Sequence, residues 1–323
     1  MNNKKEHLNI SCLQDKAVLN SDFINLCFAS SNEYAQHLSV ALKSIFSNKK
    51  QEEKFNITIL ENNISEKNKR WIKSIIDENS TVRFVKIDDE FIRRNCILRA
   101  DIPHINSLST YYRFLLADII TESKVLYLDC DVIVNKSLGE LFNTDISECY
   151  IAGVRDSYEI ENCQRLNLTQ YVNAGVLLIN SDLWRKDNIS QKLLDLSYEN
   201  QKEILWLDQD VINIVLQGKI KYLNNLYNAQ VSELKFGLTK DFNKIADKAV
   251  IIHYVGYKKP WQNNHFILSR YYYKYLLKTK FAYKYFLLLL SEIFSIKEEI
   301  SGVKTYRVIR VLGLKLKLRK EKR

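Results

Sequence analysis

The stretch Lys124-Val-Leu-Tyr-Leu-Asp-Cys-Asp-Val-Ile-Val134 decides how the rest of the chain is interpreted. Residues 125–128 are apolar and β-prone, which predicts a short strand buried on both faces. Asp129 and Asp131 follow this run, and apolar residues resume at position 132. Two carboxylates at the end of a buried strand cost free energy unless a cation offsets their charge. The pair therefore predicts an Mg²⁺ or Mn²⁺ site, with an ordinary strand-ending turn as the alternative.

Composition predicts one large α/β domain with an extension rather than a disordered chain. Hydrophobic residues make up 46% of the 323 residues and aromatic residues 11%. The net charge is +10, but the last 23 residues, 301–323, carry +8 of it. The remaining 300 residues are nearly neutral, so the basic character belongs to the C-terminal end.

Cysteine usage and the absence of long apolar runs indicate a protein of a reducing compartment. The six cysteines are scattered with no CxxC pair, which argues against a zinc site or a disulfide framework. The N-terminus has no apolar signal-peptide core, and no apolar stretch reaches the ~18 residues of a transmembrane helix. These features predict a cytoplasmic location.

Strand-like and helix-like segments alternate along the chain. Residues 24–29, 55–60 and 82–87 read as strands, and residues 34–46 and a segment starting at 65 read as helices between them. This alternation predicts a mainly parallel sheet with right-handed crossovers. A helix over 110–120 then leads to the strand 125–128. Further strands are expected at 150–154, 171–180 and 249–255, and a further helix at 207–213.

Six markers, in this order, resemble the family 8 retaining glycosyltransferases, in particular the bacterial lipopolysaccharide galactosyl- and glucosyltransferases. The markers are Phe28-Ala-Ser-Ser-Asn-Glu-Tyr34, Arg113, Tyr127-Leu-Asp-Cys-Asp131, Asn173-Ala-Gly175, Leu207-Asp-Gln-Asp210 and His253-Tyr-Val-Gly-Tyr-Lys-Lys-Pro-Trp261. The resemblance implies a GT-A type Rossmann-like α/β/α sandwich over residues 20–268. It also implies a UDP-sugar donor, UDP-Gal or UDP-Glc, and a metal ion, Mn²⁺ with Mg²⁺ as the alternative.

The resemblance assigns roles to individual residues. Asp129, Asp131 and His253 become the metal ligands, and Asp156, Asp208, Gln209 and Asp210 become candidates for the catalytic groups. The donor-binding set is Ala29, Ser30, Ser31, Tyr34, Arg113, Asp129, Cys130, Asp131, Asn173, Ala174, Gly175, His253, Gly256 and Lys259. The first loop departs from the usual family pattern, which has Asp at the position of Ser31 and Asn at that of Glu33. Base recognition is therefore less firmly implied than metal binding.

Retention of the anomeric configuration leaves two routes open. One is a double displacement through a covalent intermediate, and the other is attack from the face that UDP leaves. Gln209 occupies the position of the family's β-face group, but an amide is a poor nucleophile compared with a carboxylate. The sequence does not choose between these routes.

Two other functions compete with the transferase. A nucleotidyltransferase would share the fold class and the acidic pair, but it usually has a Gly-rich basic loop after the first strand, where this chain has Ser-Ser-Asn-Glu. A nucleic-acid-binding protein would use the basic end, yet the body of the chain lacks a basic or aromatic RNA-binding motif, so no nucleic acid is expected as a partner.

The C-terminal extension, residues 269–323, is predicted to be helical and basic. Its apolar stretch at 281–300 is too short to span a bilayer, and the segment 306–320 interleaves apolar residues with cations. A core-packing helix followed by a solvated charge run is one reading. The other, which we favour, is a peripheral enzyme held on an anionic surface at the inner face of the cytoplasmic membrane, near a glycan or lipid-linked glycan acceptor.

Overall fold

The computed structural model describes residues 23–96, 107–199, 204–231, 242–256, 258–262, 268–301, 304–311 and 314–319. The chain divides into two compact units, 1–258 and 259–323, earlier in the sequence than the predicted boundary after residue 268.

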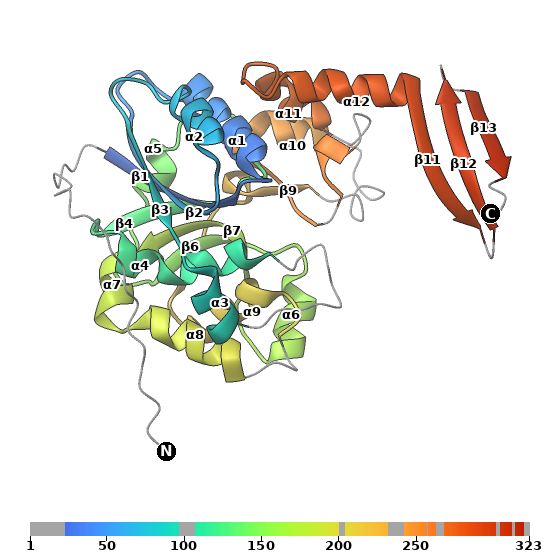
Figure 1. The fold of residues 1–323 in the computed structure, drawn as a ribbon. Coiled ribbons are helices and arrows are strands. Elements are labelled where there is room, and N and C mark those ends of the chain that lie inside the picture. The colour runs from blue at the N-terminus through green and yellow to red at the C-terminus, as the bar shows by residue number, and fades with distance from the viewer. Residues whose placement is uncertain are drawn as a thin grey trace. The chain divides into compact units, whose positions relative to one another are not determined.

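The first half of unit 1 has the predicted β-α-β-α-β order. Strands β1 (Phe23–Ser31), β2 (Lys54–Asn62) and β3 (Thr81–Lys86) pair in parallel, and helices α1 (Ala35–Asn48) and α2 (Glu66–Lys73) connect them. Helix α3 (Asp89–Asn95) follows. Figure 1 shows α1 and α2 on one face of the sheet and α3 on the other. Covering both faces explains why β1 is almost continuously apolar and buried.

The second half of unit 1 completes a seven-stranded sheet in the order β3-β2-β1-β4-β7-β6-β8. Strand β4 (Lys124–Leu128) is parallel to β1, as predicted for the strand before the acidic pair. Strand β7 (Val172–Asn180) is antiparallel to both β4 and β6 (Ile151–Arg155), and β8 (Ile220–Tyr222) is parallel to β6. The sheet is therefore mainly parallel with one reversed strand.

Helices on the α3 side bury the larger part of the core. These are α4 (Leu116–Ile119), α7 (Ser181–Lys186), α8 (Ile189–Glu199) and α9 (Leu207–Val215). Their side chains form one buried cluster with the sheet, including Leu116, Trp184, Leu193 and Ile212. The described part of unit 1 also contains α5 (Gly139–Phe142), α6 (Glu159–Leu166), α10 (Phe242–Lys248) and the 3₁₀ helix η3 (Asn225–Tyr227).

A second sheet, of three strands, brings His253 beside the acidic pair. Its order is β5-β10-β9, formed by β5 (Val132–Val134), β10 (Ile251–Tyr254) and β9 (Ala229–Val231). His253 in β10 pairs with Val132 in β5. Because β5 begins directly after Asp131, this register brings His253 to the acidic pair across some 120 residues of sequence.

The helix predicted over 110–120 differs from the expectation in its type. Residues Leu108–Leu115 form a 3₁₀ helix, η2, and only Leu116–Ile119 are α-helical. The first part, Ser-Thr-Tyr-Tyr, consists of residues with modest α-helix propensity. The tighter 3₁₀ turn is also the usual form for short functional segments, and Arg113 lies within it.

The second unit corrects the prediction of a helical extension. Its helices are η5 (Pro260–Gln262), α11 (Ser269–Leu276) and α12 (Tyr283–Ile293), but from residue 294 it is a sheet. Strands β11 (Phe294–Ser301), β12 (Lys304–Val311) and β13 (Leu314–Arg319) pair antiparallel. The physical reason is the two-residue alternation of apolar and charged residues, as in Leu-Lys-Leu-Lys-Leu-Arg from 314 to 319. That period fits a strand and not a helix.

Aromatic side chains pack the start of this unit. Trp261 lies 5.3 Å from Tyr272 between ring centroids, and Tyr273 lies 4.6 Å from Tyr285, which ties α11 to α12. The hydroxyl of Tyr273 also donates to the carbonyl of Pro260 at 2.8 Å. In the part of the chain that the structure describes, no helix is long and apolar enough to cross a bilayer.

Candidate functional site

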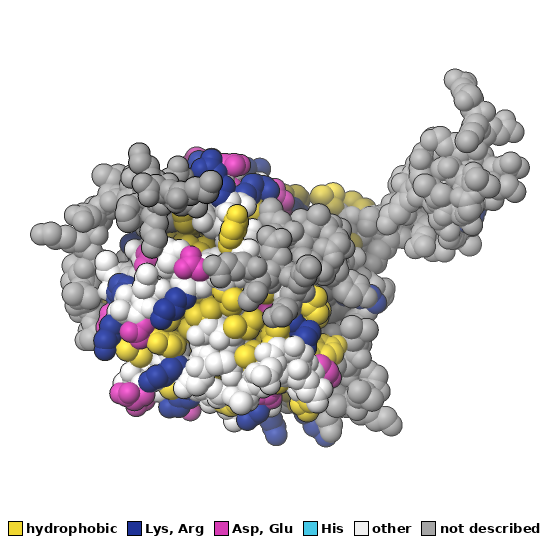
Figure 2. Space-filling model, turned by 90° about the horizontal axis from the view of Figure 1, so that it is seen from below, with side chains coloured by type: hydrophobic (Ala, Val, Ile, Leu, Met, Phe, Trp, Pro, Cys, Tyr) yellow, Lys and Arg dark blue, Asp and Glu magenta, His cyan; other side chains and the backbone are white. Residues whose placement is uncertain are grey.

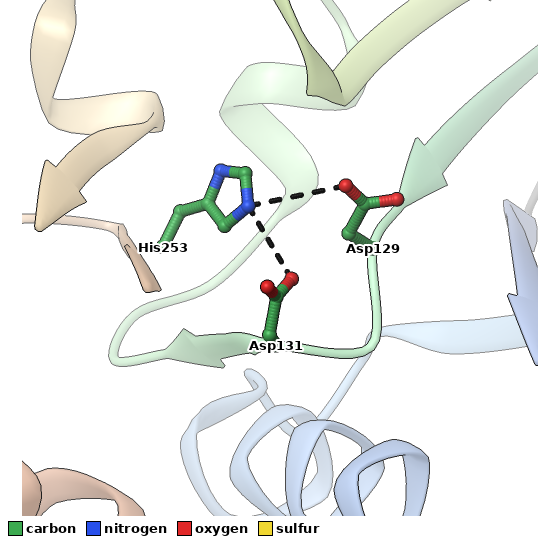
Figure 3. Close-up of side chains that lie close together, drawn as sticks. All are labelled: Asp129, Asp131 and His253. Atoms are coloured by element: carbon green, nitrogen blue, oxygen red, sulfur yellow. Dashed lines mark ion pairs between the residues drawn. The ribbon is translucent and has the colours of Figure 1, made fainter. Parts of the chain in front are cut away.

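Asp129, Asp131 and His253 meet where the two sheets of unit 1 join, and Figure 3 shows their side chains converging. Nε2 of His253 lies 3.3 Å from Oδ1 of Asp131 and 3.9 Å from Oδ2 of Asp129. One ligand atom from each residue lies within 4.8 Å of the others. The histidine is buried and both carboxylates are partly exposed. The structure thus brings together the three residues predicted to bind metal.

Gly175 in β7 lies directly against His253 and Asp129. A Cβ atom at this position would lie 2.2 Å from Cε1 of His253 and 2.7 Å from Oδ2 of Asp129. The backbone amide of Asp129 donates to the Gly175 carbonyl at 2.8 Å, so the strand and the acidic loop are held together. Two carboxylates and one imidazole that converge at a position with no room for a Cβ on Gly175 fit a divalent cation with oxygen and nitrogen ligands.

Arg113 supports the cluster from within the core. Its Nη2 lies 2.8 Å from Oδ1 of Asp129, its Nε lies 3.1 Å from Oδ2 of Asp208, and its guanidinium stacks 4.3 Å from the Tyr127 ring centroid. Burial lowers the pKa of Arg113, but the carboxylates of Asp129 and Asp208 outweigh this effect and raise it overall. A cation that is always charged therefore orients Asp129.

Asp208 is a buried carboxyl next to Arg113. Burial raises its pKa to about 6, although the charge of Arg113 and a hydrogen bond from the hydroxyl of Thr110 oppose that rise. Its Oδ1 contacts Thr110 and its Oδ2 contacts Arg113, and both of these residues belong to η2. Its contacts are those of a residue that holds Arg113 in place.

Gln209, Asn173 and Asp156 form a second cluster next to the first. Nδ2 of Asn173 donates to Oδ2 of Asp156 and to Oε1 of Gln209, both at 3.1 Å. The amide of Ala174 also donates to Oε1 of Gln209, at 3.0 Å. Two donors therefore occupy the Gln209 oxygen, while its Nε2 lies 3.3 Å from Asp156.

Asp210 has a different environment from the other predicted catalytic residues. It is fully buried, and its Oδ1 accepts from Arg165 at 2.8 Å and from the hydroxyl of Tyr171. Its Oδ2 accepts from the backbone amides of Leu205 and Trp206, at 2.8 and 2.9 Å. With donors on both oxygens, the carboxylate anchors the start of α9, near the favourable end of the helix dipole.

The turn between β1 and α1 lies close to the acidic pair. The thiol of Cys130 donates to the carbonyl of Ala29 at 3.2 Å, which joins the Asp-Cys-Asp loop to the end of β1. Ser30 is buried beside it and Ser31 is half-buried. Tyr34 is 40% exposed, and burial together with the charges of Asp131 and Asp129 raises its pKa. The predicted donor loop and the metal cluster thus share one region of unit 1.

Two predicted residues follow β10. Gly256 adopts a φ of +81°, a left-handed conformation that favours glycine, and its Cα faces open space. Lys259 belongs to the second unit, so its role at the cluster stays a prediction.

Asn228 is a site residue that the sequence reasoning missed. Its Oδ1 lies 3.1 Å from Nδ1 of His253, and its side chain is buried. The only sequence signal is an asparagine before a three-residue apolar-polar-apolar strand, which is too common to single out. Thr110 and Tyr127 also carry no specific signal in the sequence. Thr110 contacts Asp208, and Tyr127 contacts Asp129.

With this geometry in view, comparisons with known proteins decide the family. A sequence model of glycosyl transferase family 8 matches residues 25–265, well over half of the chain. The chain belongs to glycosyl transferase family 8. The prediction of a retaining glycosyltransferase with the GT-A fold is confirmed, in place of the nucleotidyltransferase and nucleic-acid-binding alternatives.

Individual relatives agree with the family. A putative glycosyltransferase of Haemophilus influenzae is 32% identical over 249 residues, which cover 75% of this chain and 74% of the relative. The lipopolysaccharide 1,3-galactosyltransferase of Salmonella typhimurium is 30% identical over 210 residues, 58% and 61% of the two chains. The crystal structure of galactosyltransferase LgtC with donor and acceptor sugar analogues superposes with a TM-score of 0.67 at 26% identity, covering 80% of this chain and 96% of LgtC.

Proposed function

We propose that this family 8 enzyme transfers galactose or glucose from a UDP-sugar to a hydroxyl of a surface glycan, such as lipopolysaccharide, with Mn²⁺ at the Asp129–Asp131–His253 cluster. The observation that carries the proposal is the convergence of these three ligand atoms within 4.8 Å. A divalent cation there would supply positive charge to the diphosphate leaving group. The names of the Salmonella relative and of the LgtC complex support a galactosyl donor and a sugar acceptor.

The donor would lie along the residues that surround the cluster. The turn formed by Ala29, Ser30 and Ser31 would contact the nucleoside, with Tyr34 against the base. The backbone at Gly256, where a Cβ would meet no atom within 4 Å, would approach the diphosphate, and the cation of Lys259 stays a prediction from the family resemblance. Arg113 would act mainly by orienting Asp129, since its guanidinium nitrogens already contact Asp129, Asp208 and two carbonyls.

Among the two routes to retention, the contacts favour attack from the face that UDP leaves. A double displacement needs an accessible nucleophile. The oxygen of Gln209 accepts from two donors, and both oxygens of Asp210 are occupied by Arg165, Tyr171 and two backbone amides. Oδ2 of Asp156 accepts from Asn173 and Gln209, and its Oδ1 accepts from the Tyr158 amide at 2.8 Å. We assign Asp156, Asn173 and Gln209 to binding of the transferred sugar or the acceptor, and Asp210 to positioning α9.

A donor screen tests the proposal. UDP-Gal, UDP-Glc, UDP-GlcNAc and UDP-GalNAc are incubated with the enzyme and Mn²⁺, and released UDP is measured alongside pyrophosphate. We expect UDP release from UDP-Gal or UDP-Glc that stops on chelation of the metal and is absent in Asp129→Ala. Pyrophosphate release, or metal-independent turnover, would contradict the proposal.

We further propose that unit 2 holds the enzyme on an anionic membrane surface. Helix α12 exposes Tyr283, Phe286, Leu287 and Leu290, which are 47–58% accessible and spaced along one stripe of the helix. Exposed lysines at 274, 278, 280 and 284 lie on and between α11 and α12. In β13, Leu316 and Leu318 are exposed, as is Lys317 between them. Apolar side chains flanked by cations suit the interface of an anionic bilayer.

Vesicle binding tests this second proposal. The full-length chain should bind phosphatidylglycerol vesicles at low salt better than phosphatidylcholine vesicles. The triple variant Phe286→Ser, Leu287→Ser, Leu290→Ser should bind the phosphatidylglycerol vesicles at least about tenfold more weakly. The reason is that burying three apolar side chains in the bilayer interface is worth several kcal/mol. Donor hydrolysis in solution should stay unchanged. Equal binding of both proteins would remove α12 from the membrane contact.

By contrast, the face of unit 1 seen in Figure 2 presents mixed charge. On the face seen in Figure 2, Lys and Arg side chains alternate with Asp and Glu and form no continuous basic surface. A surface of this kind is an ordinary solvated one. The membrane proposal therefore rests on unit 2 alone.

A further inference from the structure

The ring of His253 contacts Asn228 on the side that faces away from the carboxylates. Nε2 points to Asp129 and Asp131, as Figure 3 shows, while Nδ1 lies 3.1 Å from Oδ1 of Asn228. Asn228 lies between η3 and β9 and is 1% exposed. An imidazole binds a metal ion through the nitrogen that carries no hydrogen. Which nitrogen carries the hydrogen therefore decides whether His253 can be a ligand.

One backbone amide fixes the direction of every hydrogen bond that leads to His253. The amide of Gly175 can only donate, and it lies 3.1 Å from an atom of the Asn173 side chain that must therefore be Oδ1. Asn228 contacts this same oxygen at 2.9 Å, so it must do so with its NH₂ group. Its remaining atom, Oδ1, is an acceptor and faces Nδ1 of His253. Nδ1 must then carry the hydrogen, which leaves the lone pair on Nε2.

The same chain of contacts reaches the second cluster. Nδ2 of Asn173 donates to Asp156 and Gln209, the residues that we assign to sugar binding. Asn228 thus joins the metal cluster on one side to the polar cluster on the other. These links come from β6, β7, α9 and the segment before β9, which are far apart in sequence.

We propose that Asn228 is a positioning residue that sets the tautomer of His253 and thereby the metal affinity of the cluster. The inference rests on the proposed metal site. Partners of this kind next to a metal-binding histidine typically contribute about 10–100-fold to metal affinity. Asn228 does not touch the ion, and its effect passes through His253.

Two variants of Asn228 separate its two hydrogen bonds. Asn228→Leu keeps the approximate volume but removes the acceptor, so Mn²⁺ affinity should fall by about 10–100-fold. Asn228→Asp keeps an acceptor for Nδ1–H, but it replaces the donor to Asn173 with a carboxylate oxygen that faces Oδ1 of Asn173. It should retain wild-type Mn²⁺ affinity or exceed it. Asn180→Leu is the matched control, because Asn180 also makes two side-chain hydrogen bonds, to the Leu183 amide and the Ile146 carbonyl, at the opposite end of β7.

The experiment measures Mn²⁺ binding by calorimetry and the tautomer of His253 by ¹⁵N NMR of histidine-labelled protein. His253 should be the Nδ1–H tautomer in the wild type, in Asn228→Asp and in Asn180→Leu, and should lose that preference in Asn228→Leu. The same Mn²⁺ affinity in Asn228→Leu as in the wild type, or an equal loss in Asn228→Asp, overturns the role of Asn228. Failure of the wild type to bind Mn²⁺ at all would instead overturn the metal site of the proposed function.

Discussion

Replacing Gly175 with alanine should disable the metal cluster through a single methyl group. The added Cβ would lie 2.2 Å from Cε1 and 2.9 Å from Nε2 of His253, and 2.7 Å from Oδ2 of Asp129. To reach an ordinary van der Waals contact of 3.4 Å, the histidine ring must move by about 1.2 Å. Metal sites tolerate ligand displacements of only about 0.2 Å. We therefore expect Mn²⁺ affinity to fall at least about tenfold, equivalent to about 1.4 kcal/mol.

The assay is thermal unfolding with and without Mn²⁺, together with calorimetric titration. At a free concentration of about 100 times the wild-type Kd, Mn²⁺ should stabilise the wild type by about 2.7 kcal/mol, and Gly175→Ala should lose at least about half of this gain. Gly153→Ala is the control. Its Cβ would meet Leu177 and Val172 at 3.1–3.3 Å, so it should lose about 1–3 kcal/mol of stability to overpacking and keep its response to Mn²⁺. A Gly175→Ala protein with wild-type Mn²⁺ affinity would refute the geometric argument.

Three further predictions concern the residues around the cluster. Asp210→Ala should lower the free energy of unfolding by about 3 kcal/mol in denaturant titrations, because the substitution leaves Arg165, Tyr171 and two backbone amides unpaired. A stable but inactive variant would instead make Asp210 catalytic. Asp208 has a folded pKa of about 6, above its unfolded value of about 3.9, so its stabilising protonation is complete below pH 4 and is lost as the pH rises through 6. The stability of metal-free wild type minus that of Asp208→Asn should therefore fall by about 2 kcal/mol from pH 4 to pH 7, and a flat or rising difference would contradict the burial of this charge. Gly256→Ala should cost about 1–2 kcal/mol through its φ of +81° alone, since the new Cβ meets no atom within 4 Å; unchanged stability would show that the backbone relaxes there.

Much of unit 1 could be predicted because its strands carry strong local signals. The apolar runs that became β1, β2, β4 and β7 are buried on both faces, and the β-α alternation fixes a largely parallel sheet. Asp129, Asp131 and His253 could be identified as a set only through the family resemblance. Nothing local in the sequence says that β10 pairs with β5, which is the pairing that brings the histidine to the carboxylates.

The features that could not be predicted depend on tertiary contacts or, in the second unit, on two sequence patterns that favour different secondary structures. Asn228 acts through its position beside His253, and an isolated asparagine carries no signal of that. Asp210 is a candidate catalytic carboxylate in the sequence, and the four donors that support its proposed positioning role are visible only in the folded chain. In the second unit, the alternating Leu-Lys pattern of β13 predicts a strand, whereas the apolar run that precedes it favours a helix.

Metal binding by Asp131→Ala tests the central claim most directly. Calorimetric titration with Mn²⁺ in the presence of UDP should give one site per wild-type chain, and donor hydrolysis should require that site. In Asp131→Ala, whose loss removes a carboxylate 3.3 Å from Nε2 of His253, we expect no measurable Mn²⁺ binding and no metal-dependent UDP release. Wild-type Mn²⁺ binding and full UDP release by Asp131→Ala would contradict the assignment of this cluster as the metal centre of the enzyme.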